Sequence, residues 1–372
     1  MWTWLFAGLL LVCAAAFPTV GQARTGSYIE PHVDVFTMGP GEHVFTRFGH
    51  AAICITDEKS PEGRCYNYGT ADFSTPGPLT WGVLRGRGAF WVSVLPLEHM
   101  LFLYRREDRT VYRQRLPLSS AQKTAVIAEL HKADRPENTL YNYRHFDDNC
   151  TTRIRDLLDS ITDGSLRRNN TTANEPSLRT HVEHGFAASM PLLLLSELVL
   201  GRRVDVPIAG WDSMFLPDVF RQKISERLGA PPETISARAN PLPTPSPLPP
   251  VFVWTVLAML LLGLSRLGRA GRVVALAVLC LFAAFPWALF CIARLPELRF
   301  SEVLLVLWPT DGLLLWNRTF RVYATVRGVS LLLVLLGKTV GVLLQPIWGL
   351  WLFAALPLLS VWHIQKQAQT QA

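Results

Sequence analysis

The chain has 372 residues, a formal net charge of +7 and 49% hydrophobic residues, so it is long enough for two or more domains. Its arginines are scattered through the first 230 residues, without a basic stripe or an array of stacking aromatics, which argues against a nucleic-acid partner. From about residue 251 onward the sequence is mostly apolar, and arginines between apolar runs are typical of membrane topology.

The N-terminus reads as an export signal. Residues 2–17 form an apolar run that is too short to cross a membrane comfortably. Pro18 and the small-residue sequence Gly21-Gln22-Ala23 follow this run, which predicts a secretory signal peptide at residues 1–23. No Lys or Arg precedes the run, so an uncleaved signal anchor is the alternative.

Export changes the meaning of the cysteines. Three of them fall in the signal or in a later apolar run: Cys13, Cys280 and Cys291. Cys54 and Cys65 flank a probable hairpin connection at residues 56–64, so they could face each other and form a disulfide. Cys150 would then be an unpaired thiol in an oxidising compartment, which suggests a reactive use.

The exported domain mixes strand and helix patterns. Strands are predicted at residues 33–38, 45–55, 65–69, 89–95 and 110–116. The sequence Ser119-Ser120-Ala121-Gln122 resembles a capping box and predicts a helix to about Ala133. A stretch of about a dozen apolar residues from Met190 is too short to span, and it predicts a core helix or a helix on the membrane surface.

The second and third strands place one histidine beside a polar partner. If Cys54 opposes Cys65 in an antiparallel pair, the period of two puts His50 and Asn67 on the same face as both cysteines. Asn67 is then a diagonal neighbour of His50 and can orient its imidazole ring. Taken alone, a single histidine such as His50 is more often structural.

Residues 145–158 carry the most informative pattern of the chain. Four apolar residues follow the spacing of a helix with one buried stripe: Ile154, Leu157, Leu158 and Ile161. Asp148 or Asn149 is a plausible N-cap, so Cys150 falls in the first turn. Unpaired N–H groups at a helix start lower the pKa of a thiol, although Cys150 also fits as a small core residue.

Residues 230–250 contain eight prolines and predict a semi-rigid spacer without helix or strand. Apolar runs follow at residues 251–265, 273–293, 300–316, 329–345 and 346–363. They predict a transmembrane domain of about five spans over residues 251–363, followed by a tail at 364–372. With the exported domain outside, five spans put the basic segments between these runs on the cytoplasmic side.

The third apolar run contains Glu302, Trp308 and Asp311, which make it expensive in lipid. It is therefore predicted to break or dip, with these polar groups facing protein or a water-filled cavity. Carboxylates inside a membrane suggest function, so all three residues are candidates for substrate contacts. A position at the membrane edge is the alternative.

A Cys at a helix start, a strand His and a polar residue beside the ring form a thiol nucleophile with its base. His50 precedes Cys150 by about 100 residues in the chain. This order resembles the circularly permuted papain-like (NlpC-like) thiol fold, which includes lecithin:retinol acyltransferase. In that fold a strand His comes first and an Asn-Cys at a helix start follows.

Four motifs resemble more specifically the bacterial Lnb family of lipoprotein N-acyltransferases. They are Phe48-Gly49-His50-Ala51-Ala52, Tyr66-Asn67-Tyr68-Gly69, the run from Asp148 to Asp156, and Met214-Phe215-Leu216-Pro217-Asp218. The resemblance covers residues 28–220 and implies an α+β thiol domain with an antiparallel sheet at 24–229, followed by an α-helical transmembrane bundle. The sequence Trp308-Pro309-Thr310-Asp311 departs from the family pattern.

The resemblance implies a membrane-bound acyltransferase that needs no metal and no cofactor. A phospholipid donates an acyl chain to Cys150, and the thioester passes it to the N-terminal amine of a lipoprotein. His50 is the implied base and Asn67 its orienting group, with support from Tyr68, Asn149 and Arg153. The implied location is the bacterial inner (cytoplasmic) membrane, with the thiol domain in the periplasm.

Two other functions use the same sequence differently. A papain-like cysteine peptidase or amidase acting on peptidoglycan peptides would need the same Cys and His, but at most a membrane anchor. A non-enzymatic membrane scaffold with a degenerate thiol domain would need neither side chain. The intact Gly-His and Asn-Cys pairs speak against the scaffold.

Overall fold

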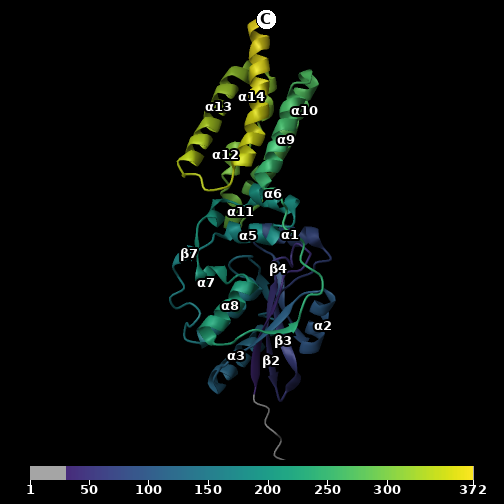
Figure 1. The fold of residues 1–372 in the computed structure, drawn as a ribbon, viewed down its shortest axis with the longest axis vertical. Helices are drawn as coiled ribbons and strands as arrows, with labels where there is room; N and C mark the ends of the chain where they lie inside the picture. The colour runs from purple at the N-terminus through teal and green to yellow at the C-terminus, as the bar shows by residue number, and fades with distance from the viewer. Residues whose placement is uncertain (1–30, 372) are drawn as a thin grey trace, which may run out of the picture.

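The computed structural model describes residues 31–371 and shows an α+β domain with a helical domain stacked along its long axis (Figure 1). The predicted signal peptide at 1–23 lies outside the described residues. The described part confirms the expected α+β class with an antiparallel sheet, followed by apolar helices.

The main sheet has seven strands in the order β6-β4-β3-β2-β1-β5-β9, and each neighbouring pair is antiparallel. Its strands are β1 (His32–Met38), β2 (His50–Asp57), β3 (Ser60–Thr70), β4 (Ala89–Pro96), β5 (Val111–Arg115), β6 (Leu140–Asn142) and β9 (Glu233–Ser236). A separate pair consists of β7 (Ala173–Glu175) and β8 (Ile208–Ala209).

Helices cover both faces of the main sheet. The α+β domain contains α1 (Pro76–Leu84), α2 (Leu97–Arg106), α3 (Ser120–Ala133), α4 (Cys150–Ile161), α5 (Leu178–Phe186), α6 (Met190–Val199), the 3₁₀ helix η1 (Arg202–Asp205), α7 (Gly210–Ser213) and α8 (Pro217–Leu228). On one face α3, α4 and α8 bury the larger core, which includes Ile53, Ile154 and Leu158. On the other face α2 packs over a smaller core around the two paired cysteines.

The first strands follow the predicted register with shifted ends. Cys54 pairs with Cys65 across β2 and β3, as expected. The connection is much shorter than residues 56–64, because β2 runs to Asp57 and β3 starts at Ser60. Residues 45–48 were predicted as strand but form a turn, in which the N–H of Gly41 donates to the carbonyl of Thr46 at 2.9 Å.

The proline-rich segment is not the pure spacer that its composition predicts. Residues 233–236 form β9, which pairs with β5 at the edge of the sheet. Asp108 then holds the segment by accepting from the N–H groups of Ala239 and Asn240 at 2.7 and 3.0 Å. Pairing is possible here because β9 falls in the gap between two proline clusters, where the N–H groups are free to bond.

The helical domain contains α9 (Pro250–Ser265), α10 (Gly268–Ile292), α11 (Pro296–Arg299), α12 (Val303–Val306), η2 (Asp311–Leu315), α13 (Asn317–Thr339) and α14 (Trp348–Gln371). Three of these helices are long and apolar enough to cross a membrane, at 268–292, 320–339 and 348–367. The third apolar run is broken into α12 and η2, as its polar residues predict. The first part of the fourth apolar run lies in α13, which begins earlier, at Asn317. This helix includes Arg327, which is buried and paired with Asp311.

The two domains meet at α6, which was predicted as a core or surface helix. Glu197 of α6 accepts a hydrogen bond from the indole N–H of Trp254 at 2.7 Å. Directly after α6, the N–H of Gly201 donates to the carbonyl of Glu297 at 2.6 Å, and the N–H of Arg202 donates to that of Phe300 at 2.9 Å. The bond from Trp254 ties α6 to α9, and the two backbone bonds tie the residues after α6 to the segment between α10 and α12.

Gly49 provides a test of how the start of β2 is built. Its backbone is left-handed, at φ 83°, and an added Cβ would lie 2.7 Å from the carbonyl oxygen of Met38. We expect Gly49→Ala to lower the free energy of unfolding by about 1–3 kcal/mol through backbone strain and this clash. Thermal unfolding of the full chain measures the loss, and Gly77→Ala is the control because nothing lies within 4 Å of its added Cβ. Equal midpoints for both variants would contradict the prediction.

Candidate thiol active site

The N-terminus of α4 is fixed by one amide side chain. Asn149 is the N-cap, and its Oδ1 accepts from the N–H groups of Thr151 and Thr152 at 2.9 Å each. Its Nδ2 donates to the carbonyls of His145 and Phe215, at 2.8 and 2.9 Å. Both donors of the amide are therefore used, so Asn149 positions the first turn and has no N–H left for a substrate.

His50 lies at the first position of β2, beside Asn67 of β3. Its Nε2 is 3.4 Å from Oδ1 of Asn67, while Nδ2 of the same amide donates to the carbonyl of Cys65 at 3.1 Å. The bond to Cys65 sets the orientation of the amide, so the oxygen faces the imidazole. In this arrangement Nε2 carries the ring proton and Nδ1 is free to act as a base.

The thiol of Cys150 is buried in the first turn of α4, with only 8% of the residue exposed. Burial raises the pKa of this thiol. The charge of His50 and its hydrogen bond act against burial. The backbone N–H of Ala51 and the hydroxyl of Thr151 add to this effect, and together these groups lower the pKa of the thiol to about 7. A thiol with this pKa is substantially ionised at neutral pH, as thiol nucleophiles require.

Aromatic side chains form the wall beside the thiol. A Cβ on Gly69 would lie 3.7 Å from Cβ of Cys150 and 3.6 Å from the ring of Tyr143, so a glycine leaves room there. Tyr143 stacks on Phe90 with ring centroids 4.4 Å apart, and Phe90 contacts Phe73 at 6.5 Å. Phe73 is 48% exposed and lies 5.3 Å from a second exposed ring. A row of aromatic rings therefore leads from the surface toward the thiol.

The second exposed ring of this row is Phe45, which is 57% exposed. Phe45, Phe73, Phe90 and Tyr143 did not stand out in the sequence, because they come from four separate segments. No spacing rule connects them before the chain is folded.

Tyr68 and Arg153 lie on the α4 side of the sheet. Arg153 pairs with Asp148 at 2.7 Å, and its guanidinium lies 3.7 Å from the ring centre of Tyr141 and 5.9 Å from that of Tyr68. Burial raises the pKa of Tyr68 to about 12 despite the opposing charge of Arg153, so this phenol stays protonated. Asn67, and not Tyr68, is therefore the residue that contacts the imidazole of His50.

The structure contains the Cys54–Cys65 disulfide, while Cys150, Cys280 and Cys291 are free. Within residues 31–371 no group of three or more His, Cys, Asp or Glu side chains is arranged to hold a metal ion.

The three candidates from the helical domain have partners in that domain, and Glu302 also lies 3.7 Å from Arg202 of the α+β domain. Both oxygens of Glu302 accept backbone N–H bonds, from Leu344 at 3.0 Å and from Gln345 at 2.9 Å. Asp311 pairs with Arg327 at 2.7 Å, and that guanidinium lies 4.7 Å from the ring centre of Trp308. The structure therefore groups Trp308 and Asp311 with each other and does not group them with Cys150.

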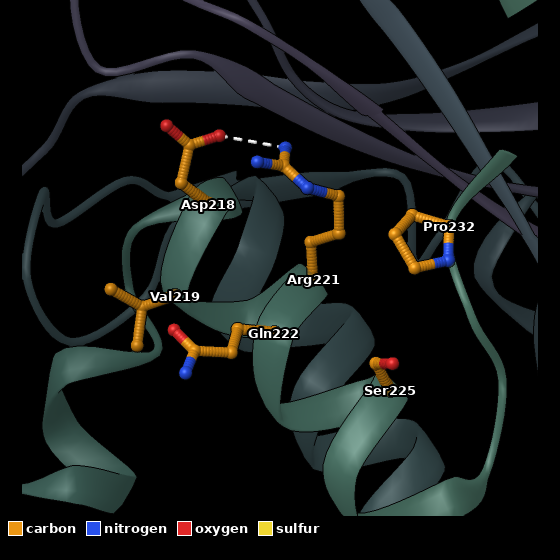
Figure 2. Close-up of a pocket in the computed structure, with 6 residues that line it drawn as sticks. All are labelled: Asp218, Val219, Arg221, Gln222, Ser225 and Pro232. Atoms are coloured by element: carbon orange, nitrogen blue, oxygen red, sulfur yellow. Dashed lines mark hydrogen bonds and ion pairs between the residues drawn. The ribbon is translucent and has the colours of Figure 1, made fainter. Parts of the chain in front are cut away.

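A surface hollow on α8 is the less suitable place for chemistry. Figure 2 shows its lining, where the guanidinium of Arg221 is turned toward Asp218 and the two pair at 2.7 Å. Arg221 also lies 4.0 Å from the ring centre of Tyr112. The charged groups of this hollow are thus already engaged, and no thiol or imidazole lines it.

Residues 27–183 match a family model described as the Lnb N-terminal periplasmic domain. The matched segment includes His50, Asn67 and Cys150, and it ends before the helical domain. No curated protein and no solved structure gives a significant match to the chain.

The contact between Cys150 and His50 predicts how the thiol reacts with pH. Alkylation of Cys150 by iodoacetamide should rise through a midpoint near pH 7, where the thiol ionises. In His50→Ala the burial remains and the opposing imidazole is lost, so the pKa rises and the midpoint moves above the ordinary thiol value of about 8.5. Mass spectrometry of the peptide that contains Cys150 measures both profiles. An unchanged midpoint in the variant would show that His50 does not act on the thiol.

The buried pair of Arg327 and Asp311 predicts a non-additive stability change. Arg327→Met alone should lower the free energy of unfolding by about 3–5 kcal/mol, because it leaves the carboxylate buried and unpaired. Replacing both residues with apolar ones should cost less than that single change. Thermal unfolding in detergent compares the two, and a double variant less stable than the single one would contradict the pairing.

Proposed function

Residues 27–183 belong to the Lnb N-terminal periplasmic domain family, and on this premise we propose that the chain is a thiol acyltransferase of lipoproteins. It takes an acyl chain from a phospholipid ester and transfers it, through a thioester on Cys150, to the N-terminal amine of a lipoprotein. The α+β domain then has the permuted papain-like arrangement and lies on the periplasmic side of the inner membrane.

One observation carries this proposal: at the start of α4, the imidazole of His50 lowers the pKa of the Cys150 thiol against the effect of burial. The imidazole is in turn held by Asn67. A nucleophile, its base and an orienting group are the parts that covalent acyl transfer needs. All three lie in the segment that matches the family model.

The first step cleaves the lipid ester. His50 accepts the thiol proton, the thiolate of Cys150 attacks the ester carbonyl, and the tetrahedral oxyanion collapses. The lipid alcohol leaves with the proton that His50 returns, and the acyl chain remains as a thioester. Asn149 occupies the N–H groups of Thr151 and Thr152, which leaves the N–H of Cys150 as the first-turn donor to the oxyanion.

The second step moves the acyl chain to nitrogen. The α-amine of the lipoprotein attacks the thioester carbonyl, His50 takes a proton from the attacking amine, and Cys150 leaves as the thiolate. The products are an amide and the free enzyme, so no oxidant, metal or nucleotide is consumed. The buried setting of Cys150 favours the amine over water as the acceptor.

The surroundings of the dyad favour a lipid ester over a peptide bond. The aromatic row from Phe45 to Tyr143 makes the region between the surface and Cys150 apolar, which suits an acyl chain. Three candidate membrane spans follow the domain, and they confine donor, acceptor and enzyme to one surface. A peptidoglycan peptidase gains nothing from either feature.

Acyl capture tests the proposal directly. Purified full-length protein incubated with phospholipid labelled in its acyl chains should carry the label on Cys150, and Cys150→Ala should carry none. His50→Ala should slow labelling by about 10²–10⁴-fold through loss of the base, and Asn67→Ala should lie between this variant and the wild type. Cys291→Ser is the matched control, because its thiol is exposed on α10.

Other outcomes would assign a different function. Cleavage of peptidoglycan peptides without an acyl adduct would favour the peptidase, and full complementation by Cys150→Ala would favour the scaffold. Labelling from a diacylglyceryl lipopeptide but not from phospholipid would keep the chemistry and replace the donor. Cells that lack the protein should lose amide-linked acyl chains on lipoproteins, which mass spectrometry of their N-terminal peptides detects.

A further inference from the structure

A cavity of about 500 Å³ lies beside the thiol site, between the loop before β2, the end of α5 and the proline-rich segment. Residues 242–245 form its wall on the side of the proline-rich segment. Ser246 fixes this wall by donating its N–H to the carbonyl of Ala187 at 2.7 Å. Arg238 holds the preceding part by pairing with Glu42 at 3.0 Å. The proline-rich wall of the cavity is therefore held in place by hydrogen bonds and an ion pair.

Two buried nitrogen atoms of the cavity lining have no hydrogen-bond partner among the described residues. They are Nε of Arg47 and Nε2 of His181. A buried donor that is left unpaired costs about 1–3 kcal/mol, and more if it is charged. Nε of Arg47 always carries a proton, and Nε2 of His181 carries one in one of its two neutral tautomers, so one acceptor could satisfy both atoms. His184 also lines the cavity, so the lining contains one guanidinium and two imidazoles.

The charge in the cavity favours an anion. Burial and the neighbouring His184 lower the pKa of His181 despite the carboxylate of Glu175, so the fixed positive charge comes from Arg47. Asp218 is the acidic residue of the lining, and its carboxylate is already paired with Arg221 at 2.7 Å. Within residues 31–371, Arg47 lines the cavity without a carboxylate partner, and arginine binds phosphate oxygens well.

The cavity lies close to the thiol and to the membrane helices. Phe48 lines it two residues before His50, and its ring centre is 4.7 Å from that of His145, whose carbonyl bonds to Asn149. On its other side, residues 246 and 250 are at most roughly 14 Å apart in extended chain. Residue 250 begins α9, an apolar helix of the domain that contains the three candidate spans, so the cavity lies near the junction with that domain.

We propose that this cavity binds the phosphate group of the glycerophospholipid donor, with Arg47 and His181 as ligands. The proposal rests on the proposed function and deepens it, since it assigns the donor to the phosphate-bearing lipids. The apolar remainder of the lining, which includes Phe48 and Leu216, suits the glycerol and the first carbons of the acyl chains. Holding the phosphate here fixes the lipid one loop away from His50.

Ligand-dependent thermal stabilisation of the full-length chain tests the site without turnover, in a Cys150→Ala background. A soluble short-chain phosphatidylglycerol should stabilise this protein, whereas the phosphate-free short-chain diacylglycerol should do so much less. Adding Arg47→Gln or His181→Leu should weaken the apparent affinity for the phospholipid about tenfold and leave that for the diacylglycerol unchanged. Arg106→Gln is the charge-matched control, because Arg106 is exposed on α2, away from the membrane helices (Figure 1).

Three results would overturn the proposal. Phospholipid binding that is unaffected by both cavity variants would remove the site, and equal binding of the phosphate-free lipid would remove its ligand. Stabilisation by inorganic phosphate as strong as that by the phospholipid would assign the site to a free anion. The unliganded midpoints of the variants report whether each one folds.

The outcome is separable from that of acyl capture. Label on Cys150 together with unaffected phospholipid binding in Arg47→Gln and His181→Leu would reject the cavity and keep the enzyme. Phosphate-dependent binding without any label on Cys150 would do the reverse.

Discussion

The site depends on Asn149, whose side chain makes four hydrogen bonds and whose backbone N–H makes a fifth. It caps α4 through Thr151 and Thr152, and it ties that cap to the carbonyls of His145 and Phe215. The hydroxyl of Thr152 completes the box by accepting from the N–H of Asn149 at 2.8 Å. Through these bonds one buried amide fixes the position of Cys150 in the first turn of α4 and ties that turn to the distant segment at Phe215. An aspartate could cap the helix equally well but could not donate to the two carbonyls.

The sheet supplies the other half of the geometry. Gly49 turns the chain into β2 with a left-handed backbone, and His50 follows as the first residue of the strand. Because His50 is at the end of the strand, its ring can meet a thiol from the helix that packs on the opposite face. A histidine in the middle of β2 would have the whole sheet between it and Cys150. The position of His50 at the end of a central strand therefore follows from one glycine and one strand boundary.

Much of this arrangement could be predicted from the sequence where the signal is local. The spacing of Ile154, Leu157 and Leu158 defines α4, the capping sequence at Ser119 defines α3, and the paired cysteines define the register of β2 and β3. Strand ends were less predictable, since residues 45–48 have strand-like side chains but are closed into a turn by their own backbone bonds. Composition was also a poor guide at β9, because residues 233–236 of the proline-rich segment contain no proline and can pair with β5.

Contacts between distant segments had no local signal. The aromatic row joins four segments, and the cavity also joins four, which lie up to about 200 residues apart in the chain. The helical domain shows the same limit, because Arg327 looks like a break in hydropathy until its partner Asp311 is known. Sequence patterns report which face of an element is buried, whereas these features depend on which elements meet.

The disulfide between Cys54 and Cys65 has a consequence for the maturation of the nucleophile. The two cysteines are 11 residues apart in one hairpin, and Cys150 follows Cys65 by 85 residues. If the domain is exported, as the proposed function requires, a chain translocated from its N-terminus exposes the hairpin cysteines to periplasmic oxidants before the third thiol emerges. The early pair consumes the two partners with which Cys150 could be wrongly oxidised, so the order of cysteines along the chain protects the reactive sulfur during biogenesis.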